Sequence, residues 1–331
     1  MKRVTIKDVA KKAGVSITTV SHALSGGGVV KQETRDRIRE LAREMNYMPN
    51  WSGKSLKAEA TGVIGLYISY IRGFYGQLAD AMYDVCREAG YELNIVIAAD
   101  GNAILDNLLS RRVDGAVILH HGFSDADAEV VMNCELPTVF LDRELTGPKV
   151  SSVLFDSFGT GYMAAEHLYS LGHRRMLLAE GQNTYDGIER SRGFRAFLEE
   201  KGIPLPEEYA IYGGFDRDQA KHSMEKFLKS GYPMPTAVFA ANDDSAIGCM
   251  QALSAAGYSV PGDVSVLGCD NIELGKWYVP GLTTLETGIS NQAVTAAREL
   301  VNLLKNQDQG TLTKLPSKLV ERSSSAAPKN I

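Results

Sequence analysis

The apolar positions of the first 49 residues repeat with the spacing of amphipathic helices. In TIKDVAKKA, one helix face carries four apolar residues, Ile6, Val9, Ala10 and Ala13. Thr5 is a suitable N-cap for this helix, and Gly14 ends it. The segment ETRDRIRELAREM repeats the pattern, and Pro49 follows its end. The pattern therefore predicts a first and a third helix, with VSITTVSHAL between them.

The stretch VSITTVSHAL combines strand-like composition with helix signals. Its β-branched residues favour a strand. Ser16, however, is a good N-cap, and Val15 and Val20 then occupy the two positions of a hydrophobic staple. A helix, a glycine turn and a second helix form a helix-turn-helix, whose second helix can enter the major groove of DNA. The alternative is an edge strand or a small structural bundle.

The exposed face of this second helix has side chains suited to base edges. Ile17 and the threonine methyl groups can contact thymine methyls, and Thr18 and His22 can hydrogen-bond to bases. The hydroxyl groups that can bind phosphates belong to Thr5, Thr19 and Ser21.

From residue 61 onwards, apolar strands alternate with helical segments. The strands are VIGLYI, YELNIVI, GAVILH, TVFLD, MLLAE, AVFAAN and VSVLG. The helices are expected at 76–89, 159–171, 187–201, 216–229, 244–256 and 289–304. This alternation predicts parallel sheets covered by helices on both faces, and the number of strands favours two doubly wound sheets. Ligands of such sheets bind at the carboxyl ends of the strands.

Charge separates the two parts of the chain. Residues 1–60 carry 12 Lys/Arg and 6 Asp/Glu, a net charge of +6, whereas the remaining residues have a net charge of −11. We therefore expect only the N-terminal part to meet a polyanion. Residues 50–60, NWSGKSLKAEA, form a polar linker with one apolar residue, Leu56, in its second half.

Several other classes of protein are disfavoured by the sequence. The four cysteines form no C-x-x-C pair, so we expect buried free thiols and no metal site. No apolar segment suits a signal peptide or a membrane span, which argues against a transport receptor. No P-loop, G-x-G-x-x-G turn or G-x-S-x-G elbow supports an enzyme. We expect the tail SSSAAPKNI to be disordered, and no leucine heptads indicate a coiled coil.

The quoted motifs resemble the LacI family of bacterial transcription repressors. TIKDVAKKAGVSITTVSHAL and ETRDRIRELAREMNYMPN resemble the family's N-terminal signature, and GKSLK resembles its hinge helix. VDGAVIL, FLDRE, AAEHLYSLGHRR, ERSRGFRAFL, VFAANDDSAIG, VLGCDN and PGLTTLE resemble landmarks of its effector domain. Lys31 stands where the third helix usually has a serine cap.

This resemblance implies an all-α helix-turn-helix domain at 1–49, a hinge at 50–60 and an α/β effector domain at 61–331. The effector domain would be periplasmic-binding-protein-like, with subdomain N at about 61–156 and 287–314 and subdomain C at about 157–286 and 315–325. A bacterial cytoplasmic homodimer would bind double-stranded operator DNA at the nucleoid. Ile17, Thr18 and His22 would read bases, and Leu56 and Lys57 would enter the minor groove.

The family positions also imply an effector site between the subdomains. The residues expected there are Phe74, Tyr75, Asp142, Arg190, Phe215, Asn242 and Asp270. Carboxylates, an amide and a guanidinium suit vicinal hydroxyls, and aromatic faces suit a sugar. A sugar or sugar derivative is the expected ligand, with a purine or nucleoside as the alternative, and no cofactor is expected.

Some of these residues also have purely structural interpretations. Asp270 can cap the next helix, Arg190 can form a surface ion pair, and Phe74 and Tyr75 can belong to the core. His120 and His121 follow the third strand, where we expect a solvated loop, with a cleft-facing position for one of them as the alternative.

Overall fold

The computed structural model describes residues 4–25, 30–45, 47, 60–71, 74–305 and 309–329. The chain forms two compact units, one ending at Thr61 and the other beginning at Gly62. The expected hinge residues Leu56 and Lys57 lie outside the described residues. No helix in the described ranges combines the length and apolarity that a membrane crossing needs.

The first unit contains three helices around a small apolar core, as the sequence predicted. They are α1 (Ile6–Ala13), α2 (Ile17–Ser25) and α3 (Gln32–Glu44). The buried residues come from all three helices and include Val9, Val20 and Ile38, each fully buried. Gly14 has a φ of 67°, which allows the sharp turn between α1 and α2 without the steric cost of a Cβ atom.

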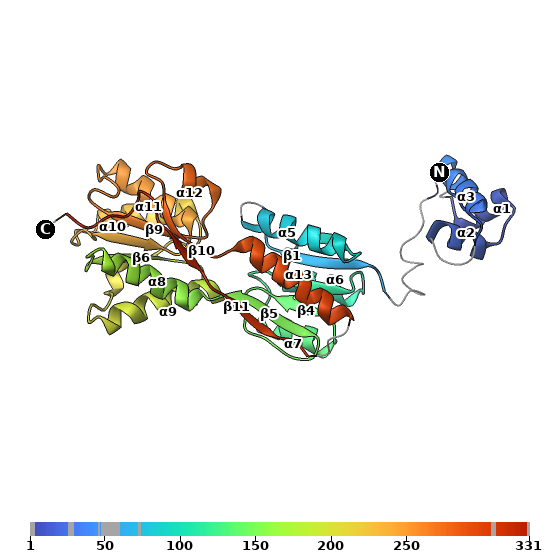
Figure 1. Ribbon diagram of the computed structural model, residues 1–331, viewed down its shortest axis with the longest axis horizontal. Coiled ribbons are helices and arrows are strands. Elements are labelled where there is room, and N and C mark those ends of the chain that lie inside the picture. The colour runs from blue at the N-terminus through green and yellow to red at the C-terminus, as the bar shows by residue number, and fades with distance from the viewer. Residues whose placement is uncertain are drawn as a thin grey trace. The chain divides into compact units, whose positions relative to one another are not determined.

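The first sheet of the second unit has parallel strand pairs (Figure 1). Its order is β11 (Leu312–Leu315), β5 (Val150–Phe155), β4 (Thr138–Phe140), β3 (Gly115–Leu119), β1 (Val63–Ile68) and β2 (Glu92–Ile97). Alternate residues of β1 face opposite layers. Ile64 and Leu66 pack with α5 (Phe74–Glu88) and α13 (Ile289–Lys305), and Tyr67 packs with α6 (Gly101–Leu109) and α7 (Asp125–Asn133).

The second sheet repeats this arrangement with one antiparallel edge. Its order is β12 (Lys318–Val320), β10 (Thr283–Glu286), β9 (Ser265–Cys269), β8 (Ala237–Ala240), β6 (Met176–Glu180) and β7 (Ala210–Tyr212). The pair β10–β12 is antiparallel, which departs from the expected all-parallel sheets. One face is covered by α8 (Ser157–Ser170) and α9 (Tyr185–Glu200), and the other by α10 (Arg217–Leu228) and α11 (Asp243–Ala255).

The chain crosses between the two sheets three times, between β5 and α8, β10 and α13, and β11 and β12. We call the part around the first sheet subdomain N and the part around the second sheet subdomain C. Leu315 still pairs with Phe155 in the first sheet, one residue beyond the expected limit of about 314.

Two expectations about the fold were wrong, and several strands were missed. The segment near Ser324 is packed and not disordered: Ser324 is fully buried, and its hydroxyl donates to the Val266 carbonyl oxygen at 2.6 Å. Cys134 is exposed, although Cys86, Cys249 and Cys269 are buried. The β5, β7, β10, β11 and β12 strands were not predicted, because most of them are short and border loops.

Candidate functional site

The α2 helix presents the residues expected to contact DNA on its exposed side. Ile17 is 45% exposed, and Thr18 and His22 are also exposed, whereas Ser21 is half-buried. Ser16 caps the helix, since its Oγ accepts the Thr19 N–H at 3.0 Å. The buried Val20 and the half-buried Val15 belong to one core, as a hydrophobic staple requires. The strand alternative for this stretch is therefore wrong.

Two of the expected phosphate-binding hydroxyls already have partners within the first unit. The Thr5 hydroxyl donates to the Asp8 carboxylate at 2.7 Å, and the Thr19 hydroxyl lies 2.9 Å from that of Ser16. A phosphate contact by Thr5 would therefore replace its bond to Asp8. Lys31 precedes α3 without a side-chain cap bond, as expected of a lysine at that position.

A cavity of about 770 Å³ lies between subdomains N and C, and we call it the cleft cavity. All seven residues expected in the effector site line it: Phe74, Tyr75, Asp142, Arg190, Phe215, Asn242 and Asp270. They come from segments far apart in sequence, because parallel strands place the loops at their carboxyl ends along one edge. The cleft cavity is large enough to hold a small polar molecule.

The crossing of α8 and α9 fixes the position of Arg190. A Cβ atom on Gly161 would lie 1.9 Å from the Arg190 carbonyl oxygen, and one on Gly193 would lie 1.9 Å from that of Phe158. Glycine at both positions therefore allows the two helices to pack closely, side by side (Figure 1). This contact holds the first turns of α9 against the sheet and directs Arg190 into the cleft cavity.

Arg190 is a buried cation and not the surface residue that the alternative interpretation required. Its side chain is 4% exposed, and Nη1 donates to the Ala241 carbonyl oxygen at 2.6 Å. Nη1 also lies 3.8 Å from Oδ1 of Asp270. Among the residues that the structure describes, none accepts a hydrogen bond from its Nε. A buried guanidinium donor without a partner is costly, and a ligand oxygen could satisfy it.

Asp270 does not cap the helix that follows it. The N-cap of α12 (Glu273–Trp277) is Ile272, whose N–H donates to the Asp243 carboxylate at 2.8 Å. Asp270 and Asn271 instead have φ values of 108° and 56°, a rare conformation that the surroundings must impose. Burial raises the pKa of Asp270 to about 6, and the nearby charge of Arg190 opposes this rise.

Two residues, Asp243 and Arg322, stabilise the strained turn at Asp270 through hydrogen bonds. Asp243 is fully buried and also accepts the Thr284 hydroxyl at 2.6 Å. Burial raises the pKa of Asp243 to about 8, and the charge of Asp270 adds to the increase. Arg322 donates to the Asn271 side-chain oxygen at 2.6 Å. The turn therefore depends on groups from two distant parts of subdomain C.

Asn242 and Phe215 are linked to each other in the wall of subdomain C. Asn242 caps α11, because its Oδ1 accepts the Ser245 N–H at 2.9 Å, and its Nδ2 donates to the Phe215 carbonyl oxygen at 3.2 Å. The ring of Phe215 packs against Gly181, where a Cβ atom would lie 2.3 Å from the ring. Asn242 therefore has a structural role in positioning this wall.

Aromatic residues form much of the wall on subdomain N. The rings of Tyr70 and Tyr75 lie 4.4 Å apart, and Phe74 contacts Phe155 at 6.3 Å between ring centroids. Tyr75 belongs to the apolar core and also lines the cleft cavity, so its two interpretations are compatible. The Tyr75 hydroxyl lies 3.2 Å from Nε2 of His121.

His121 lines the cleft cavity and is exposed in a turn, whereas His120 is buried, so the expectation of a solvated loop was wrong for His120. Partial desolvation lowers the pKa of His121, although the charge of Asp142 opposes the change. His120 is buried beneath it, and its Nε2 lies 3.1 Å from the Ala98 carbonyl oxygen. Asp142 is paired with Arg143, whose Nε donates to Oδ1 at 3.0 Å.

Sequence reasoning missed other residues of the cleft cavity wall. Among them are Tyr70, Gln182, Asp186 and Arg217. Asp186 precedes Arg190 by four residues, so the spacing alone places both on one face of α9. The other three gave no such signal, because they lie in or next to loops. Among the described residues, no cluster of His, Cys, Asp and Glu is suited to a metal ion.

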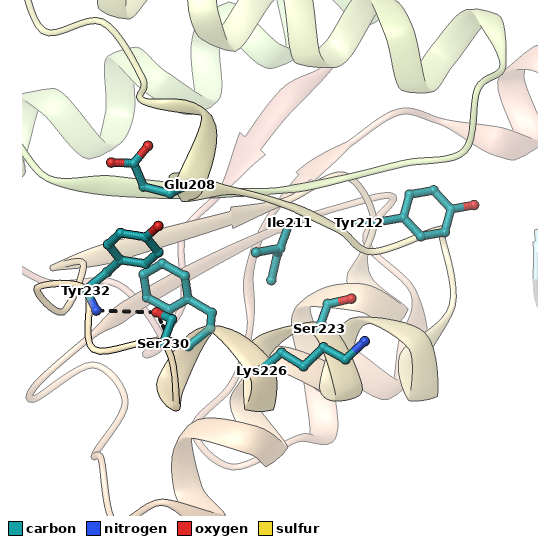
Figure 2. Close-up of a pocket in the computed structure, with 8 residues that line it drawn as sticks. Glu208, Ile211, Tyr212, Ser223, Lys226, Ser230 and Tyr232 are labelled. Atoms are coloured by element: carbon teal, nitrogen blue, oxygen red, sulfur yellow. Dashed lines mark hydrogen bonds between the residues drawn. The ribbon is translucent and has the colours of Figure 1, made fainter.

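A second, open hollow of about 400 Å³ lies on subdomain C (Figure 2). Ile211 and Tyr212 reach it from β7, and Ser223 and Lys226 from α10. None of the seven residues expected at the effector site lines this hollow. The candidate ligand site is therefore the cleft cavity.

The fold and the site together define a class of protein: a helix-turn-helix module joined to a two-lobed ligand-binding unit. The sequence matches two family descriptions, "Bacterial regulatory proteins, lacI family" over residues 5–50 and "Periplasmic binding protein-like domain" over residues 165–325. The chain is 32% identical to the probable HTH-type transcriptional repressor ExuR of Bacillus subtilis strain 168, over 92% of this chain and 93% of that protein.

Solved structures show the same architecture. The Lac repressor dimer bound to operator and the anti-inducer ONPF has a TM-score of 0.81 at 28% identity and covers 98% of this chain and 100% of that one. The complex of the transcriptional regulator CelR with cellobiose has a TM-score of 0.74 at 27% identity, with the same coverage. The chain therefore belongs to the LacI family and is a DNA-binding transcriptional repressor, which confirms the resemblance found in its motifs.

Proposed function

We propose that a sugar or sugar derivative binds in the cleft cavity and controls the affinity of this repressor for its operator. The observation that carries the proposal is the composition of the cavity wall. Aromatic rings of Phe74 and Phe215 belong to opposite subdomains, and the charged groups of Arg190 and Asp270 lie in the same wall. Aromatic faces suit the C–H face of a sugar, and charged groups suit its hydroxyls.

The hydrogen-bonding groups favour a sugar over a purine or nucleoside. The amide of Asn242 is occupied by Ser245 and Phe215, so it is poorly placed to recognise the edge of a base. Carboxylates accept hydrogen bonds only, and a sugar offers more O–H donors than a purine offers N–H donors. The binding of cellobiose by the structurally similar CelR supports this choice. A purine remains the alternative, since the aromatic rings could stack on a base.

On the DNA side, we propose that Ile17, Thr18 and His22 contact base edges and that Thr5, Thr19 and Ser21 contact phosphates. The exposure of Ile17, Thr18 and His22 on α2 supports the base contacts, and the positions of Thr5 just before α1 and of the half-buried Thr19 and Ser21 on α2 support the phosphate contacts. Leu56 and Lys57 remain proposed minor-groove contacts. The structural similarity to the Lac repressor bound to its operator agrees with this assignment.

We also propose that the protein acts as a homodimer, as the similar Lac repressor does. The edge strand β2 exposes apolar side chains that a partner could cover. Ile97 is 55% exposed, Ile95 is 38% exposed, and Tyr83 on the neighbouring α5 is 54% exposed. Two copies would place two α2 helices on a pseudo-palindromic site about one or more helical turns apart.

In this mechanism the effector binds two states of the subdomain pair with different affinity. The state that it prefers becomes more populated, and the DNA affinity of the dimer changes accordingly. DNA changes the effector affinity by the same factor, because the coupling is reciprocal. The proposal therefore requires that the effector changes the affinity for DNA and that DNA changes the affinity for the effector.

The experiment begins with selection of a binding site from random duplex DNA by the full chain. Operator affinity is then measured by fluorescence anisotropy with and without neutral sugars, purines and nucleosides. We expect at least one sugar to change operator affinity tenfold or more in the wild type. The effect should be lost in Asp270→Asn and retained in Glu129→Gln, an exposed acid on α7. A response to purines and not to sugars would support the alternative ligand.

A further inference from the structure

Among the residues that the structure describes, the cleft cavity carries more negative than positive charge. Its cations are Arg190 and Arg217. Besides Asp142 and Asp270, the acids that line it are Asp186, Asp216, Asp218, Asp244 and Glu273. Two of the acids in the cavity wall form ion pairs with an arginine: Asp244 pairs with Arg217, and Asp142 pairs with Arg143. An anionic ligand would add a further negative charge to this wall, which is unfavourable in a partly desolvated site.

Arg190 interacts with two carboxylates, those of Asp270 and Asp186, in the buried part of this wall. It lies 3.8 Å from Asp270. Burial raises the pKa of Asp186, and the charge of Arg190 opposes this rise. Asp186 itself forms no ion pair with any described residue. Its partner is the Ser157 hydroxyl, which donates to Oδ1 at 2.5 Å. Two carboxylates therefore lie near the single positive charge of Arg190, which leaves one negative charge without a cation of its own.

Asp186 also interacts with an acid on the opposite subdomain. It lies in the first turn of α9 in subdomain C, whereas Asp142 follows β4 in subdomain N, and both line the cleft cavity. The charge of Asp186 contributes to raising the pKa of Asp142, after the larger effect of burial. The nearby His121 does not supply a compensating charge at neutral pH, because burial lowers its pKa below the ordinary value.

We propose that the ligand of the cleft cavity carries a protonated amine as well as hydroxyl groups, as an amino sugar does, and that Asp186 binds this amine. The inference rests on the proposed function, in which the cleft cavity binds a sugar. An ammonium group has three donors and would form charge-assisted hydrogen bonds, which are stronger than neutral ones. Because Asp142 lies on the other subdomain, a cation attracted to both acids would stabilise the closed state.

A proton on Asp186 is the competing way to remove the excess charge. In that case a neutral sugar would bind as well as its amino derivative, and amine-bearing ligands would gain nothing. The two possibilities therefore differ in a ratio of dissociation constants that can be measured directly on the full chain.

The test is isothermal titration calorimetry at pH 7 with four amino sugars: glucosamine, galactosamine, mannosamine and 6-amino-6-deoxyglucose. Each is compared with its parent sugar, and the first three also with their N-acetyl derivatives. We expect at least one amino sugar to bind tenfold or more tightly than its neutral counterparts. Asp186→Asn should reduce this preference below about threefold, as expected for the loss of a buried charge pair. Glu199→Gln, on an exposed part of the same helix, should preserve it.

Ser157→Ala provides a second variant in case Asp186→Asn does not fold, as judged by circular dichroism. Loss of the Ser157 hydroxyl removes a hydrogen bond to the Asp186 carboxylate, which a protonated amine of the ligand can replace. The preference for amine-bearing sugars should therefore be kept or increased. Equal or tighter binding of the parent sugars overturns the inference, and so does the absence of binding by all four amino sugars.

These titrations, combined with the fluorescence anisotropy measurements of operator affinity, separate the inference from the proposed function. If neutral sugars bind and change operator affinity without any preference for an amine, the proposed function stands and the inference fails. If no sugar of either kind changes operator affinity, both fail.

Discussion

Nη1 of Arg190 lies 3.8 Å from Oδ1 of Asp270, between the α9 helix and a turn whose backbone has a rare left-handed conformation. The side chains of both residues are almost fully buried. The pair joins two parts of subdomain C that both contribute polar groups to the cleft cavity. This relationship connects the stability of the subdomain to its proposed ligand site.

Replacement of Arg190 by Gln should destabilise the protein by about 3–5 kcal/mol, because it leaves buried carboxylates without their cation. The free energy of unfolding in urea, measured by circular dichroism, checks this value. Arg192→Gln is the matched control, since Arg192 lies on the same helix with a 64% exposed side chain. The control should change stability by less than about 0.5 kcal/mol. Equal losses in the two variants would contradict a special role for Arg190.

Two glycine substitutions should separate ligand binding from folding. In Gly181→Ala the new methyl group meets the far end of the Phe215 ring, which can move. We expect weaker effector binding with a loss of stability below about 1 kcal/mol. In Gly161→Ala the methyl group meets the backbone of Arg190, so the helices must separate and stability should fall by about 3 kcal/mol or more. Thermal melts with and without effector distinguish the two outcomes.

Asp243 should make stability depend on pH near neutrality. Its pKa in the folded state is about 8, against an ordinary value of 3.8, so the folded state binds its proton more tightly than the unfolded state does. The resulting stabilisation is complete below about pH 4 and is lost as pH rises through 8. Asp270, with a pKa of about 6, should contribute mainly at lower pH.

Urea unfolding of the wild type between pH 6 and 8 should therefore show stability falling by up to about 1.4 kcal/mol per pH unit from this group. Asp243→Asn should flatten the slope, because the amide does not titrate. Glu129→Gln should leave the slope as in the wild type. Parallel slopes for the wild type and Asp243→Asn would show that Asp243 is not the titrating group.

Ser16→Ala should destabilise the first unit by about 1 kcal/mol, through loss of the cap on the Thr19 N–H. Hydrogen exchange of the α1–α3 amides should report this as faster opening of the first unit. Exchange in the second unit should remain unchanged, since the substitution lies in a separate compact unit. Ser16→Asp restores a capping oxygen and should recover most of the protection.

His22→Ala should weaken operator binding by about 1–3 kcal/mol and relax preference at one base pair of each half-site. Half-site variants tested by fluorescence anisotropy would detect this change. Thr5→Ala, which removes a proposed phosphate contact, should weaken binding to all sequences by a similar factor. A uniform loss on all half-sites in His22→Ala would exclude a base contact.

The sequence determined the local elements and the class of protein. Helical spacing defined α1 and α3, and the cap at Ser16 with the staple at Val15 and Val20 defined α2 against its strand-like composition. Apolar strands alternating with helical segments predicted two sheets covered by helices on both faces. These features follow from the repeat of the backbone itself, so neighbouring residues are sufficient to predict them.

Tertiary structure alone decided the environment of each charged group. Arg190 proved to be buried, Asn242 proved to be a cap, and Asp186 joined the cleft cavity wall beside fewer cations than acids. The left-handed turn at Asp270 depends on Asp243 and on Arg322, which lies 52 residues further along the chain. Such contacts join distant segments at the ends of parallel strands, and burial together with charge pairing then sets their chemistry.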